Sequence, residues 1–581
     1  MLNGILNRNR QTDLVTFEVL IDSSPLPQTV LVYSIDVWQE FNRIPRAKLA
    51  VLDGDPATET FSASEEDWFV PGKEIEIKAG YHNDHSTIFK GIVTSQALKI
   101  RSGGRNQLTV DCCDKAVCMT TVPKSRYFYN MKESEIFSEI IRRYDVLSAD
   151  VEATQYTWKE LLQFQSTDWD FVLTRADMNG LFCLVQDGTI SIKKPDFSGQ
   201  PVTEIVFGRN LLEMDAEMEA ASQLAGVNSN SWDFSKTEPS SVSASSVNPV
   251  IPGNLNQDEL ARVFQNHEWM MQFGGKIPVE VMQQWADAKL LKHELAKIRG
   301  RVRIQGSEIL PGNIVALQGI GGRFNGNAYV SGVKHSIGQG EWVTDIQYGL
   351  SPKWFSEQYP VSAQPAAGTV PAVSGLQVGI ITSIENDPDG DERVMLRLPM
   401  INGDDQGLWA RVSTTGAGAE RGFVFRPEIG DEVIVGFIHD DPNQPVILGS
   451  VHSANNPAPI TAEDDNDKKG WVTRSEIKFM VEEDKPSIYL EMPSGRKMTL
   501  DDDNGEIVFE DSSGNTVIMN SDGITIESGG DLVLKAAGNI NISGASVEAK
   551  ADMNFKASGS AGAEISSSAV TEIKGSLVQI N

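Results

Sequence analysis

The chain has 581 residues, of which 40% are hydrophobic, and it carries a formal net charge of −30. This length predicts about three or four domains with sizeable cores. Nucleic-acid binding depends on clustered lysine and arginine, so a strong acidic balance without a basic stripe argues against that class of function.

The first 360 residues combine β and α patterns. Alternating apolar residues between Gly, Pro and Asn signals predict strands across 12–120. Asp187-Gly188 predicts a hairpin between two later strands, and the Ser-, Val- and Pro-rich run at 235–252 predicts a flexible loop or insertion. Apolar periodicity and capping residues predict helices at 133–144, 167–178 and 278–299.

The middle of the chain has the pattern of a small barrel. A stretch rich in Pro, Ala and Gly at 361–375 is expected to be a linker, and a charged connector is expected at 456–480. Between them, 376–455 holds five short β-segments joined by Gly, Pro and Asp turns, which suits a closed barrel of the OB type. The segments are 378–384, 394–398, 408–412, 432–437 and 446–449.

The remaining residues, 481–581, carry a short repeat. Pairs of apolar residues one position apart recur about every eight residues, separated by corners rich in Ser, Gly and Asn. Such a tract is typical of stacked short strands whose side chains alternate between inside and outside. The candidates for the interior of the repeat are Ile524, Ile526, Leu532, Leu534, Ile540, Ile542, Val547, Phe555 and Ile565.

This repeat cannot bury its apolar side chains within one chain. A single-chain β-helix uses ~20 or more residues per turn, whereas one strand and one corner here take about eight. Open edges on so many strands would aggregate. Three chains, each supplying one face of a triangular prism, would close the structure and satisfy the backbone hydrogen bonds. A conventional sandwich is disfavoured because the segments are short and rich in Gly, Ser and Ala.

Motifs that could carry catalysis or hold a metal have simpler interpretations. The run 387–392 resembles a calcium loop but has Gly at the fourth position instead of the sixth, which favours a hairpin turn. The glycines at 319–322 are not followed by a helix, which argues against a dinucleotide site. His82 and His85 suit a loop better than a pair of metal ligands. We therefore predict no catalytic residue, no cofactor and no metal, and a protein that is not an enzyme.

The cysteines and the N-terminus indicate where the protein is made. Four cysteines, at 112, 113, 118 and 183, are too few for a secreted disulfide scaffold, so we expect reduced thiols in a protein synthesised in the cytoplasm. The N-terminus lacks the apolar core of a signal peptide, and no apolar run reaches the ~18 residues of a membrane helix. Export would therefore need another route.

Three parts of the sequence carry a family resemblance. The longest comprises 407–412, 422–437 and 441–451 in the expected barrel, and the others are 165–171 with Arg175 and Gly180, and 311–315 with 324–330 and His335. Together they resemble the VgrG proteins, the spike proteins of type VI secretion and related contractile injection systems. The resemblance implies a mainly β chain with some helices. It would comprise a phage-hub-like region with two β-barrel subdomains, an OB domain and a C-terminal triple-stranded β-helix formed by a trimer.

The resemblance also implies partners. A homotrimer would join an Hcp-like inner tube and baseplate proteins through residues 1–360, carry effector cargo and touch the target membrane transiently. A PAAR-type tip protein would dock at the C-terminal end, for which Leu577, Ile580 and Asn581 are the candidates. Some family members have an enzymatic extension after the β-helix, whereas this sequence stops at Asn581, so a bare spike is expected.

The hypothesis for function is therefore mechanical: a trimeric spike caps the inner tube and punctures a target envelope, and it leaves the cell when the apparatus fires. The alternative is a phage-like tail fibre or tailspike that binds or cleaves surface glycans. A glycan site would need a groove lined by aromatic or carboxylate residues, and 523–581 contain one aromatic residue, Phe555, which disfavours it.

Overall fold

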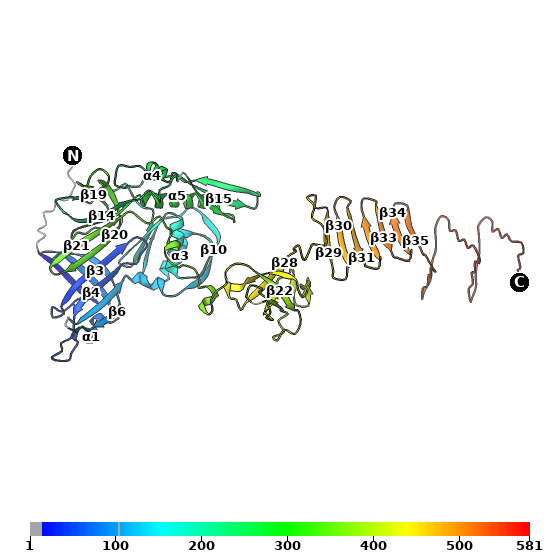
Figure 1. Cartoon of the computed structure of the whole chain (residues 1–581), viewed down its shortest axis with the longest axis horizontal. Helices are drawn as coiled ribbons and strands as arrows, with labels where there is room; N and C mark the ends of the chain where they lie inside the picture. The colour runs from blue at the N-terminus through cyan, green and yellow to red at the C-terminus, as the bar shows by residue number, and fades with distance from the viewer. Residues whose placement is uncertain (1–13, 103–104, 266–267, 402, 581) are drawn as a thin grey trace. The chain divides into compact units, whose positions relative to one another are not determined.

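The computed structural model describes residues 14–102, 105–265, 268–401 and 403–580. The chain divides into two compact units, Met1–Pro371 and Ala372–Asn581, and Figure 1 traces both. Strands far outnumber helices over the described ranges. No helix within these ranges is long and apolar enough to cross a membrane.

A 13-stranded sheet forms the frame of the first unit. Its order is β14-β18-β21-β20-β3-β4-β7-β6-β5-β1-β2, with β19 on β20 and β13 on β19. The pairing of β3 with β20 joins the first 120 residues of the chain to its strands beyond residue 298. The strands are β1 (Val15–Ile21), β2 (Ser24–Pro25), β3 (Val32–Glu40), β4 (Arg46–Leu52), β5 (Glu74–Tyr81), β6 (Asp84–Lys99), β7 (Gln107–Cys113), β13 (Thr203–Val206), β14 (Leu211–Met218), β18 (Ile298–Gln305), β19 (Ile314–Gln318), β20 (Gly326–Gly338) and β21 (Glu341–Tyr348).

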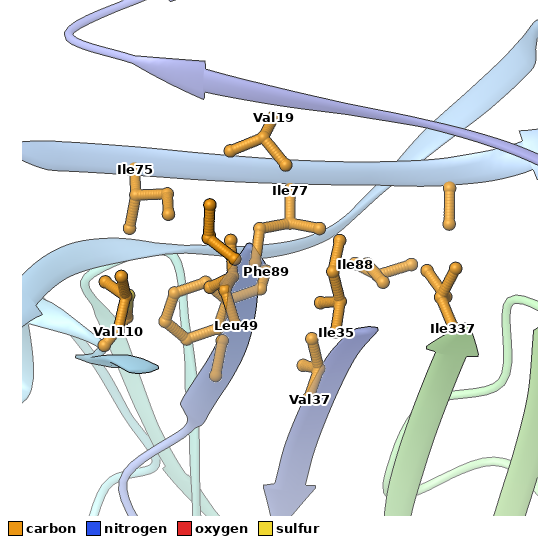
Figure 2. Close-up of a cluster of buried hydrophobic side chains, with 14 of the residues drawn as sticks. Val19, Ile35, Val37, Leu49, Ile75, Ile77, Ile88, Phe89, Val110 and Ile337 are labelled. Carbon is orange, nitrogen blue, oxygen red and sulfur yellow. The ribbon is translucent and has the colours of Figure 1, made fainter. Parts of the chain in front are cut away.

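Strand alternation builds the apolar core of the β1–β7 half of this sheet. In β5, Ile75 and Ile77 are buried while Glu76 and Lys78 point the other way. Figure 2 shows these two isoleucines meeting side chains from several other strands. A separate core lies on the β13–β21 half, so each half of the sheet is stabilised by its own cluster.

Helices and small sheets complete the first unit. Helix α3 begins after Thr167, whose side chain accepts a hydrogen bond from the backbone N–H of Asp170. The helices are α1 (Ser62–Glu65), α2 (Glu133–Arg142), α3 (Asp168–Met178), α4 (Gln257–Val263), α5 (Val279–Leu295) and α6 (Phe355–Gln358). The small sheets pair β8 (Lys124–Lys132) with β10 (Thr157–Ser166), β12 (Thr189–Lys193) with β9 (Ser148–Val151) and β11 (Phe182–Gln186), and β15 (Val227–Asp233) with β16 (Glu238–Ser243) and β17 (Trp269–Phe273).

Two expectations for this unit need correction. The helix expected at 278–299 ends at Leu295, because β18 starts at Ile298 and pairs with both β14 and β21. The Ser-rich stretch 235–252 is not wholly a loop, because β16 forms an antiparallel ladder with β15 inside it. Ser231↔Ser240 and Ser229↔Val242 are partners in that ladder, so pairing with the preceding strand overrode the local composition.

The second unit starts with a closed five-stranded barrel, as expected for an OB domain. Its strands are β22 (Gln377–Ser383), β23 (Val394–Arg397), β24 (Leu408–Val412), β27 (Glu432–Phe437) and β28 (Pro445–Ser450). Side chains such as Ile381, Leu396 and Val435 fill the barrel. A short hairpin of β25 (Ala417–Gly418) and β26 (Arg421–Gly422) lies in the long connection between β24 and β27.

A seven-stranded antiparallel sheet follows, and each strand pairs with the next in sequence (Figure 1). Its first two strands lie largely in the stretch expected to be a connector. The strands are β29 (Lys468–Val472), β30 (Lys478–Glu482), β31 (Ser487–Glu491), β32 (Lys497–Asp501), β33 (Glu506–Glu510), β34 (Thr516–Asn520) and β35 (Gly523–Glu527).

The repeat beyond Glu527 was predicted to form stacked short strands that only three chains together can close. Within this single chain, the described residues 528–580 contain no strand. The backbone groups of these residues therefore find no ladder partner in their own chain.

Candidate functional site

One face of the seven-stranded sheet is apolar. Each strand from β30 to β35 has five residues, and its second and fourth side chains lie on the same face because side chains alternate along a strand. The antiparallel register sets these positions opposite one another, as in Leu490↔Met498 and Ile488↔Leu500. We call the twelve residues the apolar face: Phe479, Val481, Ile488, Leu490, Met498, Leu500, Ile507, Phe509, Val517, Met519, Ile524 and Ile526.

The apolar face has no cover in a single chain. From Ile488 to Met519 its large side chains remain between 36% and 42% exposed, Val517 aside, and those of β35 are more exposed still. A contiguous exposed apolar surface of this kind marks an interaction site in a soluble protein.

The opposite face of the sheet is polar at its borders. Lys478 pairs with Glu491 at 3.4 Å, and Lys497 lies 4.7 Å from the centre of the Tyr489 ring. The third residue of each strand, such as Thr499 or Val508, lies between these charged borders. The opposite face thus carries charged residues at the ends of its strands, whereas the apolar face carries none.

Short turns keep the strands in register. The carboxylate of Asp511 accepts hydrogen bonds from the backbone N–H groups of Ser513 and Asn515 and from the Asn515 side chain. These bonds, the Asn515 side-chain bond first, lower the pKa of Asp511. Asp501 and Asn504 form a similar turn. The second and fourth positions of successive strands form two columns of side chains on the apolar face. Because the turns are closed by local hydrogen bonds, the alignment of these columns does not depend on distant contacts.

The structure places the predicted interior residues in two settings. Ile524 and Ile526 belong to β35 and so to the apolar face. The other seven follow the last strand and are between 53% and 81% exposed: Leu532, Leu534, Ile540, Ile542, Val547, Phe555 and Ile565. Of the expected tip residues, Leu577 and Ile580 are more than four-fifths exposed, and Asn581 lies outside the described residues.

The sequence placed the repeat at 481–581, but the candidate interior residues chosen from it began at Ile524, and ten residues of the apolar face precede that position. The signal was present as five-residue strands with apolar second and fourth positions, separated by turns such as Asp503-Asn504-Gly505. The repeat pattern was weaker before Ile524 because the spacing between strands is longer there than in the terminal repeat.

Three family descriptions match the chain in succession. The Alg8 N-terminal domain matches residues 11–339, the type VI secretion system/phage-baseplate injector OB domain matches 377–452, and the phage baseplate V C-terminal trimerisation domain matches 487–552. The second match coincides with the closed barrel and the third contains most of the apolar face.

A large β-sheet unit, a closed OB-type barrel and an amphipathic β-ladder follow one another in the same order as the three matching family domains. The chain belongs to the family that carries the Alg8 N-terminal domain, which covers more than half of it, and it is similar to VgrG-type spike proteins.

Individual relatives are distant. The type VI secretion system spike protein VgrG1b of Pseudomonas aeruginosa is 22% identical over 443 residues, which cover 70% of this chain and 57% of that protein. The actin cross-linking toxin VgrG1 of Vibrio cholerae is 31% identical over 174 residues, covering 26% of this chain and 15% of the toxin. The chain thus spans little more than half of the first relative.

A solved structure of the Escherichia coli c3393 protein, a component of the type VI secretion system, has a TM-score of 0.37 at 13% identity. The alignment covers 74% of this chain and 99% of that one. A likeness this loose carries no argument by itself.

Proposed function

We propose that three copies of this chain associate through their apolar faces and form the central spike of a contractile injection apparatus. The observation that carries the proposal is the apolar face itself, two columns of side chains exposed over six strands. The match of residues 487–552 to a trimerisation domain supports a threefold assembly. Burial of these side chains against two other copies removes them from water.

The residues after Glu527 would complete the spike. Each chain would contribute short strands to a triangular prism, so that the ladder bonds missing within one chain form between chains. The apolar residues from Leu532 to Ile565 would then point to the axis. Such a fully hydrogen-bonded rod resists bending, which suits a spike that is driven through an envelope.

The two ends of the spike would have different partners. The unit Met1–Pro371 would cap an Hcp-like inner tube and contact baseplate proteins, adapting threefold to sixfold symmetry. Leu577, Ile580 and Asn581 would dock a PAAR-type tip protein. The protein would be made in the cytoplasm, assembled into the particle with its effector cargo, and released on firing. In this role its work is mechanical, and no side chain is assigned to bond chemistry.

The first prediction tests the trimer with a matched pair on β32. Leu500→Asp puts a charge in the middle of the apolar face, whereas Thr499→Asp puts the same charge on the opposite face of the same strand. We expect light scattering to give a trimer for the wild type and Thr499→Asp, and a smaller species for Leu500→Asp, because a buried unpaired carboxylate costs several kcal/mol. A monomeric wild type, or a trimer of unchanged stability for Leu500→Asp, would contradict the proposal.

A further inference from the structure

A run of four aromatic rings joins the barrel connection to the first hairpin of the seven-stranded sheet. The ring centres of Phe423 and Phe425 are 4.7 Å apart, and Phe425 meets Trp471 edge-on at 6.0 Å. Trp471 in turn stacks on Phe479 at 4.3 Å with an interplanar angle of 17°. Phe423 and Phe425 follow β26 in the barrel connection, while Trp471 and Phe479 lie on β29 and β30. We call Phe423, Phe425 and Trp471 the collar.

The collar continues the apolar face. Trp471 and Phe479 are direct partners in the ladder and share a face, and Phe479 is paired on its other side with Leu490. One column of the apolar face therefore extends without interruption into the barrel domain. The collar lies before residue 487 and so outside the part that matches the trimerisation domain.

Polar contacts hold the collar in place. The hydroxyl of Thr414 donates to the carbonyl of Phe423, and the backbone N–H of Phe423 donates to the carbonyl of Gly416. Beside the rings, Arg474 forms an ion pair with Glu428 at 2.9 Å. These contacts come from both sides of the junction, so the rings are positioned by the barrel as well as by the sheet.

The collar is nevertheless only half covered in one chain. Phe423, Phe425 and Trp471 are 49%, 53% and 42% exposed, and Val424 and Ile429 beside them are more exposed. None of the three belongs to the core of the barrel. Ordered aromatic rings left half exposed and continuous with an interface are typical of the anchors of that interface.

The apolar face by itself does little to fix how far one chain is shifted relative to another along the axis of the trimer. Its columns contain only interchangeable apolar side chains, so a slip of one hairpin would set Phe509 at the level of Leu490 and still bury both. A slip of one hairpin moves a chain by two strand spacings, about 10 Å. The three rings of the collar extend this column at one end, and this feature occurs once per chain. It can therefore distinguish the aligned register from a slipped one.

We infer that the collar is covered by the neighbouring copies of this chain and sets the register in which the three apolar faces meet. This inference rests on the proposed trimer and adds to it the residues that fix its alignment. In the aligned trimer, equivalent residues of the three chains lie at one level, and the collar rings close the apolar interior on the barrel side. A slipped trimer would leave collar rings exposed to water.

A disulfide reporter tests the inference on the full chain. Leu500→Cys places a thiol at the centre of the apolar face, and two such thiols can bond only when their Cα atoms are within about 7 Å, which a slip of about 10 Å prevents. With the native collar we expect oxidation to link pairs of chains. Adding Phe425→Ala and Trp471→Ala should lower the linked fraction several-fold. Val424→Ala, beside the rings, should leave it unchanged, and the parent chain gives the background of the natural cysteines.

The outcomes separate the two proposals. If Leu500→Cys with the native collar is monomeric, the trimer itself fails. If the trimer forms and the linked fraction is the same with and without the collar rings, the collar inference is overturned. If the linked fraction falls in the variant with Phe425→Ala and Trp471→Ala, then a Leu500→Cys chain with Trp471→Phe and the native Phe425 should keep the high linked fraction, because a smaller ring still fills the site. Absence of that rescue would also overturn the inference, and far-UV circular dichroism checks that each variant is folded.

Discussion

The carboxylate of Asp168, at the start of α3, is fully buried and bonded from several sides. It accepts hydrogen bonds from Lys124 at 2.8 Å, Arg126 at 3.1 Å, Tyr144 at 2.7 Å and Gln163 at 2.9 Å. Burial by itself would raise the pKa of Asp168, but the bonds from Lys124, Gln163 and Tyr144 and the charge of Arg126 outweigh it, and the pKa is lowered. This network ties α3 to the β8–β10 sheet.

Asp168→Asn should therefore destabilise the protein at neutral pH. Two cations lose their counter-charge, but both retain some access to water, so we expect a cost of about 2–3 kcal/mol. Because the folded-state pKa is lowered, the contribution is present above the unfolded value near 4 and is lost as pH falls through the folded value. Melting temperatures of wild type and variant should thus converge below about pH 4. A constant difference would contradict this, and Glu139→Gln, in the exposed pair with Arg143, serves as the control.

At the scale of the element, the first hairpin of the seven-stranded sheet depends on a close approach of two backbones. Gly470 in β29 is the ladder partner of Met480 in β30. A Cβ at Gly470 would lie 2.1 Å from the carbonyl oxygen of Phe479 and 2.8 Å from the Met480 sulfur. The carbonyl belongs to the ladder and cannot move aside without separating the strands.

Gly470→Ala should consequently loosen the hairpin that carries Trp471. Overpacking of this kind costs about 1–3 kcal/mol, so the thermal transition should shift to lower temperature by several degrees. Gly530→Ala is the matched control, because a Cβ there meets nothing within 4 Å. Equal melting temperatures for the two variants would show that β29 and β30 do not need this approach.

At the scale of the whole molecule, the proposed spike would have two segments that differ in their strand pairing. From Lys468 to Glu527 each strand pairs within its own chain, so in the proposed trimer this segment would need other copies only to cover its apolar face. From 528 to 580 the described residues have no strand partner in the chain. Association and the completion of the rod are therefore separable.

A truncation after Glu527 should separate them. The shortened chain retains the apolar face and should remain a trimer by light scattering, while a PAAR-type tip protein that binds the full chain in a pull-down should no longer bind. Loss of trimers would show that association resides in the removed residues. Retained tip binding would show that Leu577 and Ile580 are not the docking site.

The sequence alone determined which elements form where local pattern is strong. The five segments of the OB barrel, the Asp187-Gly188 hairpin and the cap at Thr167 could be predicted because turn residues and alternation act over a few residues. The apolar repeat likewise indicated that one chain cannot bury it. These are short-range properties.

The tertiary structure decided what long-range pairing controls. It ended α5 at Leu295, because β18 is held between two distant strands. It placed β15, the hairpin partner of the strand in the Ser-rich stretch, beside the distant strand β17. It also placed Phe425 beside Trp471, which no local pattern predicts, because the two rings are 46 positions apart and their contact depends on how barrel and sheet meet. Composition shows that the repeat has apolar surface, but only the fold shows that this surface continues through Trp471 to the rings of the barrel connection.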